Sequence, residues 1–195
     1  MGSLEVICGP MFSGKTEELI RRLKRAVIAK RRVQCFKPRI DTRYDAEMIV
    51  SHSAQRINSI VVDSAGEIFD KLVPDVEVVG IDEVQFLGPE VFAVCQRLAD
   101  RGLRVVVAGL DMDYRGVPFD PMPQLLAVAE SITKELAICV VCGAPGSRSQ
   151  RTIAAEERVM IGAQGQYEAR CRKCFSPEPR PATDPPEQEL FPFLK

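Results

Sequence analysis

The sequence predicts an α/β protein in which a parallel sheet flanked by helices is followed by a small metal-binding module. Three observations support this prediction. Apolar, β-rich segments alternate with helical patterns over residues 1–138, an alternation typical of parallel sheets. A glycine-rich motif, GPMFSGKT, follows the first apolar segment at 9–16. Two CxxC pairs lie within 139–175, where helical periodicity is weak.

Five short apolar runs are predicted to be strands. They span residues 4–8, 34–38, 59–63, 76–81 and 104–110. Most are rich in valine and isoleucine, and turn residues bound them. Because helical patterns lie between most of them, we expect the strands to run parallel.

The helix predicted after the glycine-rich motif spans about 17–32, with Leu19, Ile20, Leu23 and Val27 on one stripe. Its residues 21–32 include seven basic residues in twelve, a density that would also suit nucleic-acid binding. Because the apolar stripe continues through them, we favour the solvated outer face of an ordinary helix.

Local signals mark the ends of the other predicted helices, one opening at Ser64 and two spanning 90–100 and 123–131. Glu67 completes a capping box with Ser64. Gly88 and Pro89 suit the cap and the first position of the middle helix. Gly102 is predicted to close that helix.

Composition limits the class of protein. The 195 residues are 46% hydrophobic and 27% charged, with a net charge of -1, which suits one globular domain with a small appendage. Nothing there requires a nucleic-acid or membrane partner, no apolar run is long enough to span a bilayer, and the N-terminus lacks a secretory pattern. We therefore expect a cytoplasmic protein. A histidine base has one candidate, His52.

The glycine-rich motif fills every required place of the phosphate-binding pattern G-x-x-x-x-G-K-[ST]. Its residues are Gly9, Pro10, Met11, Phe12, Ser13, Gly14, Lys15 and Thr16. Backbone N–H groups of such a loop point at phosphate oxygens, and the following helix adds its dipole. Lys15 is predicted to reach the β and γ phosphates, and the Thr16 hydroxyl to ligate Mg²⁺. The flanking strand and helix favour this interpretation over an ordinary turn, so ATP with Mg²⁺ is the predicted ligand.

A second magnesium ligand is expected at the end of another strand, and VEVVGIDE supplies Asp82 there. The alternative is that Asp82 and Glu83 only begin a polar loop. Ligands of open parallel sheets bind beyond the carboxyl ends of strands, although a loop salt bridge explains each further polar residue there equally well. Those further residues are Asp41, Arg43, Asp111, Asp113, Tyr114 and Arg115.

The four cysteines of the CxxC pairs are predicted to bind structural Zn²⁺. They are Cys139, Cys142, Cys171 and Cys174. Two thiolate pairs complete a closed tetrahedral site, which leaves no open position for chemistry. The gap of 28 residues between the pairs requires a loop that bulges out. The remaining cysteines, Cys8, Cys35 and Cys95, fall in strand or helix patterns and are expected in the core.

These patterns divide the chain into three parts. Residues 1–138 form the predicted nucleotide-binding domain, and 139–175 the zinc-binding domain. Residues 176–195 contain six prolines and are predicted to be a mostly disordered tail.

Over residues 4–175 the chain resembles the type II thymidine kinases. The segments that carry the resemblance are GPMFSGKT, DTRY at 41–44, GIDEVQFL at 80–87, GLDMDYRGVPF at 109–119 and CVVC…IGAQGQYEARCRKC. The resemblance implies transfer of the γ-phosphoryl of ATP to the 5′-hydroxyl of thymidine, which supplies a DNA precursor. Members of the family are typically tetramers, so it also implies a homo-oligomer.

The resemblance assigns roles to single residues. Glu83 corresponds to the catalytic carboxylate and Asp82 to its magnesium-side partner, and Val84 and Gln85 belong to the same ATP-site motif. Arg43 corresponds to the arginine near the transferred phosphate. Strand geometry supports different roles for Asp82 and Glu83, because successive side chains of a strand point to opposite faces. Asp82 is expected beside Thr16, and Glu83, which begins the loop, is expected to act as the general base.

On the nucleoside side, the resemblance implies a lasso loop at about 150–165 within the zinc domain, which accounts for the long gap between the cysteine pairs. The backbone near Met160, Ile161 and Gly162 would hold thymine, and Tyr167 would lie near the sugar. The remaining pocket-lining positions are Met11, Phe86, Leu110, Tyr114 and Phe119.

Two other classes of protein remain as alternatives. A P-loop ATPase would hydrolyse ATP without a nucleoside. A zinc-ribbon protein with a nucleotide switch would bind nucleic acid through the basic helix. The near-neutral net charge and the few aromatic residues around the cysteines weigh against this second alternative.

Overall fold

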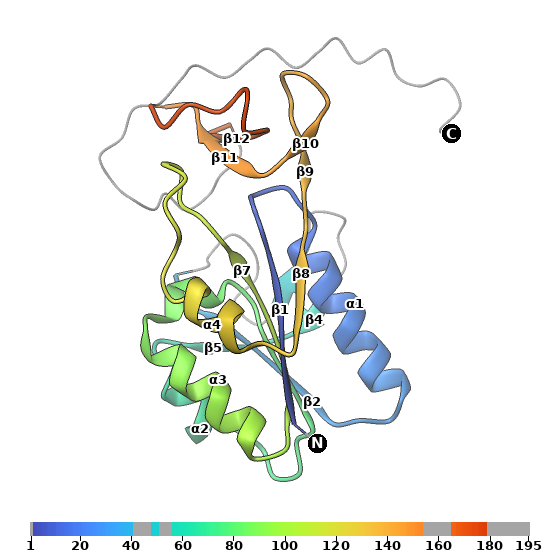
Figure 1. The fold of residues 1–195 in the computed structure, drawn as a ribbon. Coiled ribbons are helices and arrows are strands. Elements are labelled where there is room, and N and C mark those ends of the chain that lie inside the picture. The colour runs from blue at the N-terminus through green and yellow to red at the C-terminus, as the bar shows by residue number, and fades with distance from the viewer. Residues whose placement is uncertain (1, 41–47, 51–55, 154–164, 179–195) are drawn as a thin grey trace.

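The computed structural model describes residues 2–40, 48–50, 56–153 and 165–178. Its centre is a six-stranded sheet in the order β5-β2-β6-β7-β1-β8 (Figure 1), in which every pairing is parallel. The strands are β1 (Ser3–Gly9), β2 (Val33–Pro38), β5 (Ile60–Val62), β6 (Val78–Ile81), β7 (Arg104–Leu110) and β8 (Ser131–Lys134). The predicted α/β class is confirmed, and a strand overlaps each of the five predicted runs.

Helices cover both faces of the sheet (Figure 1). They are α1 (Lys15–Ile28) on one face, and α2 (Glu67–Asp70), α3 (Glu90–Asp100) and α4 (Met122–Val128) on the other. Leu19, Ile20 and Leu23 pack in the core under α1, as predicted. Val27 was predicted on the same stripe but is 55% exposed, and Ala26 completes the buried face in the last turn.

Two helix predictions were wrong in their boundaries. The short helix α2 begins after Gly66, without a side-chain cap from Ser64, although Glu67 still accepts a hydrogen bond from the backbone N–H of Asp63 at 3.3 Å. The helix predicted at 123–131 ends at Val128. Ser131 instead begins strand β8, because the edge of β1 offers it backbone partners.

Helix α3 matches its prediction closely. Its N-cap is Pro89, one residue later than predicted. Gly102 closes it at φ +91°, and its N–H donates to the carbonyl of Ala99 at 2.8 Å. A 3₁₀ turn, η1 (Val84–Leu87), connects β6 to this helix.

A small module stands beyond the carboxyl ends of the parallel strands (Figure 1). It contains two antiparallel pairs, β9 (Ala137–Ile138) with β10 (Pro145–Gly146) and β11 (Arg148–Arg151) with β12 (Tyr167–Arg170). A third pair, β3 (Met48–Val50) with β4 (Arg56–Asn58), lies outside the module. The chain enters the module directly from β8, so the module is attached to the last strand of the sheet.

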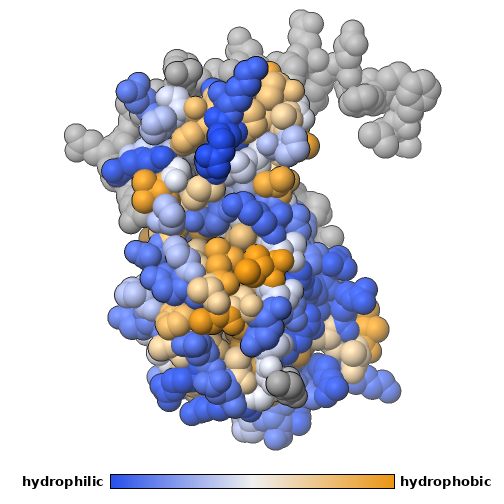
Figure 2. Space-filling view, viewed as in Figure 1, coloured by the Kyte–Doolittle hydropathy of each residue, from blue (hydrophilic) through white to orange (hydrophobic). Residues whose placement is uncertain are grey.

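Apolar side chains remain exposed along the edge of the sheet. Val128, Ile132, Leu136 and Ile138 follow one another through α4, β8 and β9, and Ile132 is 51% exposed. Figure 2 shows apolar surface over this side of the molecule. Among the described helices, none has the length and apolar character needed to cross a membrane.

Candidate active site

The glycine-rich motif forms a loop between the end of β1 and the start of α1. Gly9 has φ +149°, and a Cβ there would lie 2.2 Å from the carbonyl oxygen of Glu135, so no larger residue fits. Lys15 Nζ donates to the carbonyl of Pro10 at 2.6 Å, and Ser13 Oγ donates to the same oxygen at 2.9 Å. The loop therefore curls on itself and holds the lysine ammonium at the N-terminus of α1, where anions bind favourably.

Thr16 and Asp82 meet beside this loop. The Thr16 hydroxyl donates to Asp82 Oδ2 at 3.2 Å, and Asp82 Oδ1 accepts the backbone N–H of Glu83 at 3.0 Å. Asp82 follows directly after β6, as the sequence predicts. A hydroxyl and a carboxylate oxygen are donors that suit Mg²⁺, so the pair fits the predicted ion, whose binding stays a prediction.

Glu83 is held in an unusual conformation. Its backbone is left-handed, with φ 47° and ψ 42°, at a cost of about 1–2 kcal/mol for a residue other than glycine. Its side chain is only 7% exposed. Strain of this kind is concentrated at functional sites, which supports a role for the Glu83 carboxylate.

Gln85 fixes the direction of that carboxylate. Its Nε2 donates to Glu83 Oε2 at 2.6 Å, and its Oε1 accepts the backbone N–H of Leu110 at 3.1 Å. A Cβ on Gly109 would lie 2.6 Å from the same Gln85 oxygen, so glycine there allows the close approach. Gln85 thus ties Glu83 to the end of β7. The side chain of Val84, by contrast, is fully buried in the core, which leaves only its backbone for nucleotide contact.

The residues predicted on the nucleoside side lie in small groups. Phe86 and Phe119 pack edge to face, with ring centroids 5.8 Å apart. The backbone N–H of Met11 donates to Ser149 Oγ at 3.0 Å, which joins the glycine-rich loop to β11 of the small module.

Arg151 brings the two predicted tyrosines together, and sequence reasoning missed it. Its guanidinium lies 3.6 Å from the ring centroid of Tyr114 and donates to the Tyr167 hydroxyl at 2.8 Å. The residue is fully buried, at 0% exposure. Its only sequence signal is a place in the short run RSQR, where Arg148 is equally prominent.

The two aspartates after β7 have structural partners. Asp111 Oδ2 lies 2.8 Å from Lys134 Nζ. Burial, together with the Asp111 charge, raises the pKa of the Cys8 thiol to about 11. Asp113 Oδ1 accepts the backbone N–H groups of Arg115 and Val117 at 2.9 and 3.1 Å. For both carboxylates, contacts within the fold account for the position.

The four module cysteines form one cluster. All their sulfur atoms lie within 4.8 Å of one another, and the Sγ atoms of Cys142 and Cys171 are 3.6 Å apart. A tetrahedral zinc site with Zn–S near 2.3 Å requires sulfur–sulfur distances of about 3.8 Å. The cluster therefore fits a closed zinc site. Cys8, Cys35 and Cys95 are buried elsewhere in the core, as predicted.

The thiols of the cluster differ in acidity. Burial alone raises the pKa of Cys139, but backbone N–H groups, including that of Cys171, bring it down to about 6. Backbone hydrogen bonding at Cys174 lowers the pKa of Cys171, whereas the hydrogen bond with Cys171 raises that of Cys174 to about 12. A cation at the centre would favour ionisation of all four thiols.

Several predicted site residues lie outside the described residues. They are Asp41, Arg43, His52, Met160, Ile161 and Gly162, with most of the predicted lasso and the tail beyond Glu178. Their assignments stay predictions.

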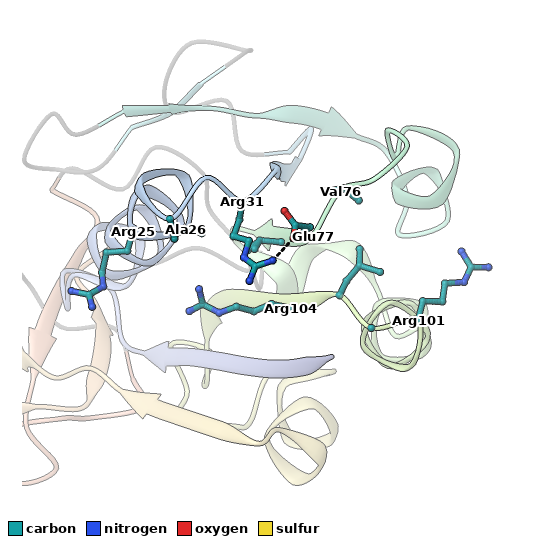
Figure 3. A pocket seen from close by; sticks show the side chains of 11 residues that line it. Arg25, Ala26, Arg31, Val76, Glu77, Arg101 and Arg104 are labelled. Carbon is teal, nitrogen blue, oxygen red and sulfur yellow. Dashed lines mark hydrogen bonds and ion pairs between the residues drawn. The ribbon is translucent and has the colours of Figure 1, made fainter. Parts of the chain in front are cut away.

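A cavity of about 620 Å³ lies at the opposite, amino-terminal edge of the sheet (Figure 3). Arg25, Arg31, Arg101 and Arg104 line it together with Glu77. Arg31 pairs with Glu77 there, and Arg104 bonds to Glu5 at 2.6 Å. None of the motif residues lines this cavity, and two of its four arginines are already paired within the fold, so it is not the candidate site.

Comparison with known proteins points to one family. A family model described as thymidine kinase matches residues 2–175. A thymidine kinase of Bdellovibrio bacteriovorus is 55% identical over 177 residues, covering 91% of this chain and 87% of that protein. One of a Rhodothermus species is 56% identical over 183 residues, covering 94% and 85%. One of Bacteroides thetaiotaomicron is 52% identical over 174 residues, covering 89% and 87%.

Proposed function

The chain belongs to the thymidine kinase family, and from this premise we propose that it transfers the γ-phosphoryl group of ATP to the 5′-hydroxyl of thymidine, yielding thymidine monophosphate and ADP. The observation that carries the proposal is the position of Glu83. Glu83 directly follows Asp82, which bonds to Thr16, and its buried carboxylate is tied by Gln85 to the end of β7.

Glu83 acts as the general base. Its carboxylate accepts the proton of the 5′-hydroxyl as that oxygen forms a bond to the γ-phosphorus, and the bond to the β–γ bridging oxygen breaks. Gln85 holds the carboxylate in the direction needed for this transfer, because it donates to Oε2. General-base catalysis by a positioned side chain is typically worth about 10² to 10⁴ in rate.

The phosphate loop supplies charge and positioning. Lys15 exchanges its bond to the Pro10 carbonyl for the β and γ phosphates, and loop N–H groups bind their oxygens. Thr16 and Asp82 would hold Mg²⁺, which when bound would neutralise charge on the phosphates. Arg43 is proposed to act on the transferred group. The remaining motif residues, proposed to surround ATP, are Gly9, Pro10, Met11, Phe12, Ser13, Gly14, Val84 and Gln85.

Thymidine binds between the sheet domain and the small module in this proposal. Met11, Phe86, Leu110, Tyr114 and Phe119 line one side, and Tyr167 and the backbone of 160–162 the other. The hydrogen bond between Met11 and Ser149 supports such a junction, because it joins the phosphate loop directly to the module. Closure of the module over the nucleoside would exclude water and so limit wasteful ATP hydrolysis.

The cysteine cluster is able to hold a metal ion, and we propose structural Zn²⁺ at this place. With four protein ligands the ion has no open position, so its role is to hold β9–β12 together. The proposed domains are 1–138 and 139–175, with 176–195 as a tail.

Two further proposals concern the state of the protein in the cell. The partly exposed apolar residues along α4, β8 and β9 support self-association, and the family suggests a tetramer. Light scattering would measure the mass in solution. The use of cysteines as a metal cluster supports a reducing compartment such as the cytoplasm.

A panel of nucleosides offered as phosphate acceptors with ATP and Mg²⁺ tests the proposed function. We expect ADP formation to require thymidine and to equal thymidine monophosphate formation. ADP release that is independent of any nucleoside would instead favour the ATPase alternative, and it would overturn the proposal.

A further inference from the structure

We propose that Arg151 is a positioning residue for the nucleoside: it fixes the plane of the Tyr114 ring and forces the Tyr167 hydroxyl to act as a hydrogen-bond donor. This inference rests on the proposed function, since both tyrosines are assigned to the thymidine side. Arg151 itself does not touch the reacting atoms.

The position of Arg151 is set by both domains. It lies on β11 directly opposite Tyr167 of β12 in the antiparallel register. Tyr114 comes from the other domain, on the loop that follows β7. A single fully buried side chain therefore contacts an aromatic residue from each side of the junction.

The contact with Tyr167 determines the direction of its proton. A guanidinium carries only donors, so the Tyr167 oxygen must be the acceptor in their 2.8 Å hydrogen bond. The phenol has one hydrogen, which cannot point back at the guanidinium and must point to another group. Tyr167 thus offers a donor to a ligand, and its partner is an acceptor oxygen of the sugar.

The contact with Tyr114 determines the ring plane. At 3.6 Å from the ring centroid, the guanidinium is within cation–π distance and close enough for stacking. A planar guanidinium is able to stack on one ring and donate to a second group at once, whereas a lysine ammonium lacks the plane. The two functions therefore require arginine in particular.

If position 151 served only to fill space in the fold, an apolar side chain would be expected there. Burying a cation carries a large desolvation penalty, and well-packed apolar residues often replace buried ion pairs without loss of stability. A buried arginine whose guanidinium contacts two site residues is better explained by the orientation it imposes on them.

Steady-state kinetics of Arg151→Met test this inference, with Arg148→Met on the same strand as the matched control. We expect KM for thymidine to rise roughly tenfold, the usual size for loss of one charge-assisted interaction. KM for ATP and kcat should stay within about twofold. Arg148→Met should resemble the wild type. Zinc content and melting temperature, measured on every variant, report on folding.

A double variant with Tyr167→Phe sharpens the test. If Arg151 acts partly through the Tyr167 hydroxyl, the double variant raises KM for thymidine by less than the product of the two single effects. Arg151→Lys keeps the charge if Arg151→Met fails to fold, and it should raise the same KM to a smaller extent.

Three results would overturn the inference: an unchanged KM for thymidine, equal losses for thymidine and ATP, or effects that multiply in the double variant. A wild-type protein that forms no thymidine monophosphate is a separate outcome, because it removes the proposed function on which the inference rests.

Discussion

The proposed phosphate side and the proposed nucleoside side of this protein are built in opposite ways. The phosphate motif is eight consecutive residues that run from the end of β1 into the start of α1. Its side-chain hydrogen bonds from Ser13, Lys15 and Thr16 go to the loop itself or to Asp82, and one backbone bond, from Met11 to Ser149, reaches the small module. The nucleoside side gathers Tyr114, Arg151 and Tyr167 from distant parts of the chain. The first site depends mainly on local backbone geometry, and the second depends on the contact between the sheet and the small cysteine-bearing module.

This difference predicts that the two sides fail separately. The loop lies on a parallel sheet with its own buried core, so damage to the module should leave it intact. The module consists of two-stranded pairs, which are marginal without further support. Its geometry should therefore depend on the cysteine cluster.

The largest effect is expected for Lys15→Ala. Removing the ammonium that faces the phosphates should abolish turnover. The fold should survive, because Lys15 Nζ bonds to the Pro10 carbonyl of its own loop and the sheet beneath has its own buried core. Activity assays with melting curves measure both, and activity near the wild-type level would contradict the phosphate-loop assignment.

Glu83→Gln comes next. The substitution keeps the shape and removes the base, so kcat should fall by about 10² to 10⁴ while ATP affinity stays nearly constant. The Gln85 amide still finds an acceptor, because the new side chain carries a carbonyl oxygen. Steady-state kinetics with an independent ATP-binding measurement test this.

Asp82→Asn is the matched control for that experiment. It removes a charge beside Thr16 and should raise the Mg²⁺ requirement. A Mg²⁺ titration of kcat separates the two carboxylates. Rescue of Glu83→Gln by added Mg²⁺, without rescue of Asp82→Asn, would show that their assigned roles are reversed.

Cys171→Ser should act on the nucleoside side. It removes one ligand of the cluster, so zinc should be lost and the module loosened. Thymidine binding should weaken more than ATP binding. Elemental analysis checks the metal first: wild-type protein purified without chelator and found free of zinc would refute the site.

The smallest effect is expected for Tyr167→Phe. Loss of one hydrogen bond to a neutral partner costs roughly 0.5–1.5 kcal/mol, which should appear in KM for thymidine and not for ATP. The same change removes an acceptor of Arg151, so a small loss of thermal stability is expected as well. Equal weakening of both substrates would point to a packing role.

The same contrast explains what was predictable from the sequence. The run at 104–110 is apolar after its first residue, Arg104, and forms β7. The phosphate motif lies between a recognisable strand and a recognisable helix. Strand β8 was missed because its four residues are largely exposed and its pairing depends on the edge of β1. The four-residue helix α2 is too short for a periodic signal.

The candidate site follows the same rule. Asp82 was placed beside Thr16 correctly, because strand direction fixes it. The cysteine cluster was predictable because the two CxxC pairs are a recognisable sequence pattern of metal ligands. Arg151 was not predictable from the sequence, because its proposed role depends on its contacts with Tyr114 and Tyr167. Both contacts are formed by the fold and leave no local sequence pattern.

A crossed binding experiment tests the separation of the two sides most directly. Calorimetry would measure the affinities for ATP and for thymidine in Lys15→Ala and in Cys171→Ser. We predict that Lys15→Ala loses affinity mainly for ATP and Cys171→Ser mainly for thymidine. Parallel loss of both affinities in both variants would contradict the account, because it would mean that the phosphate loop and the cysteine-bearing module form one inseparable site.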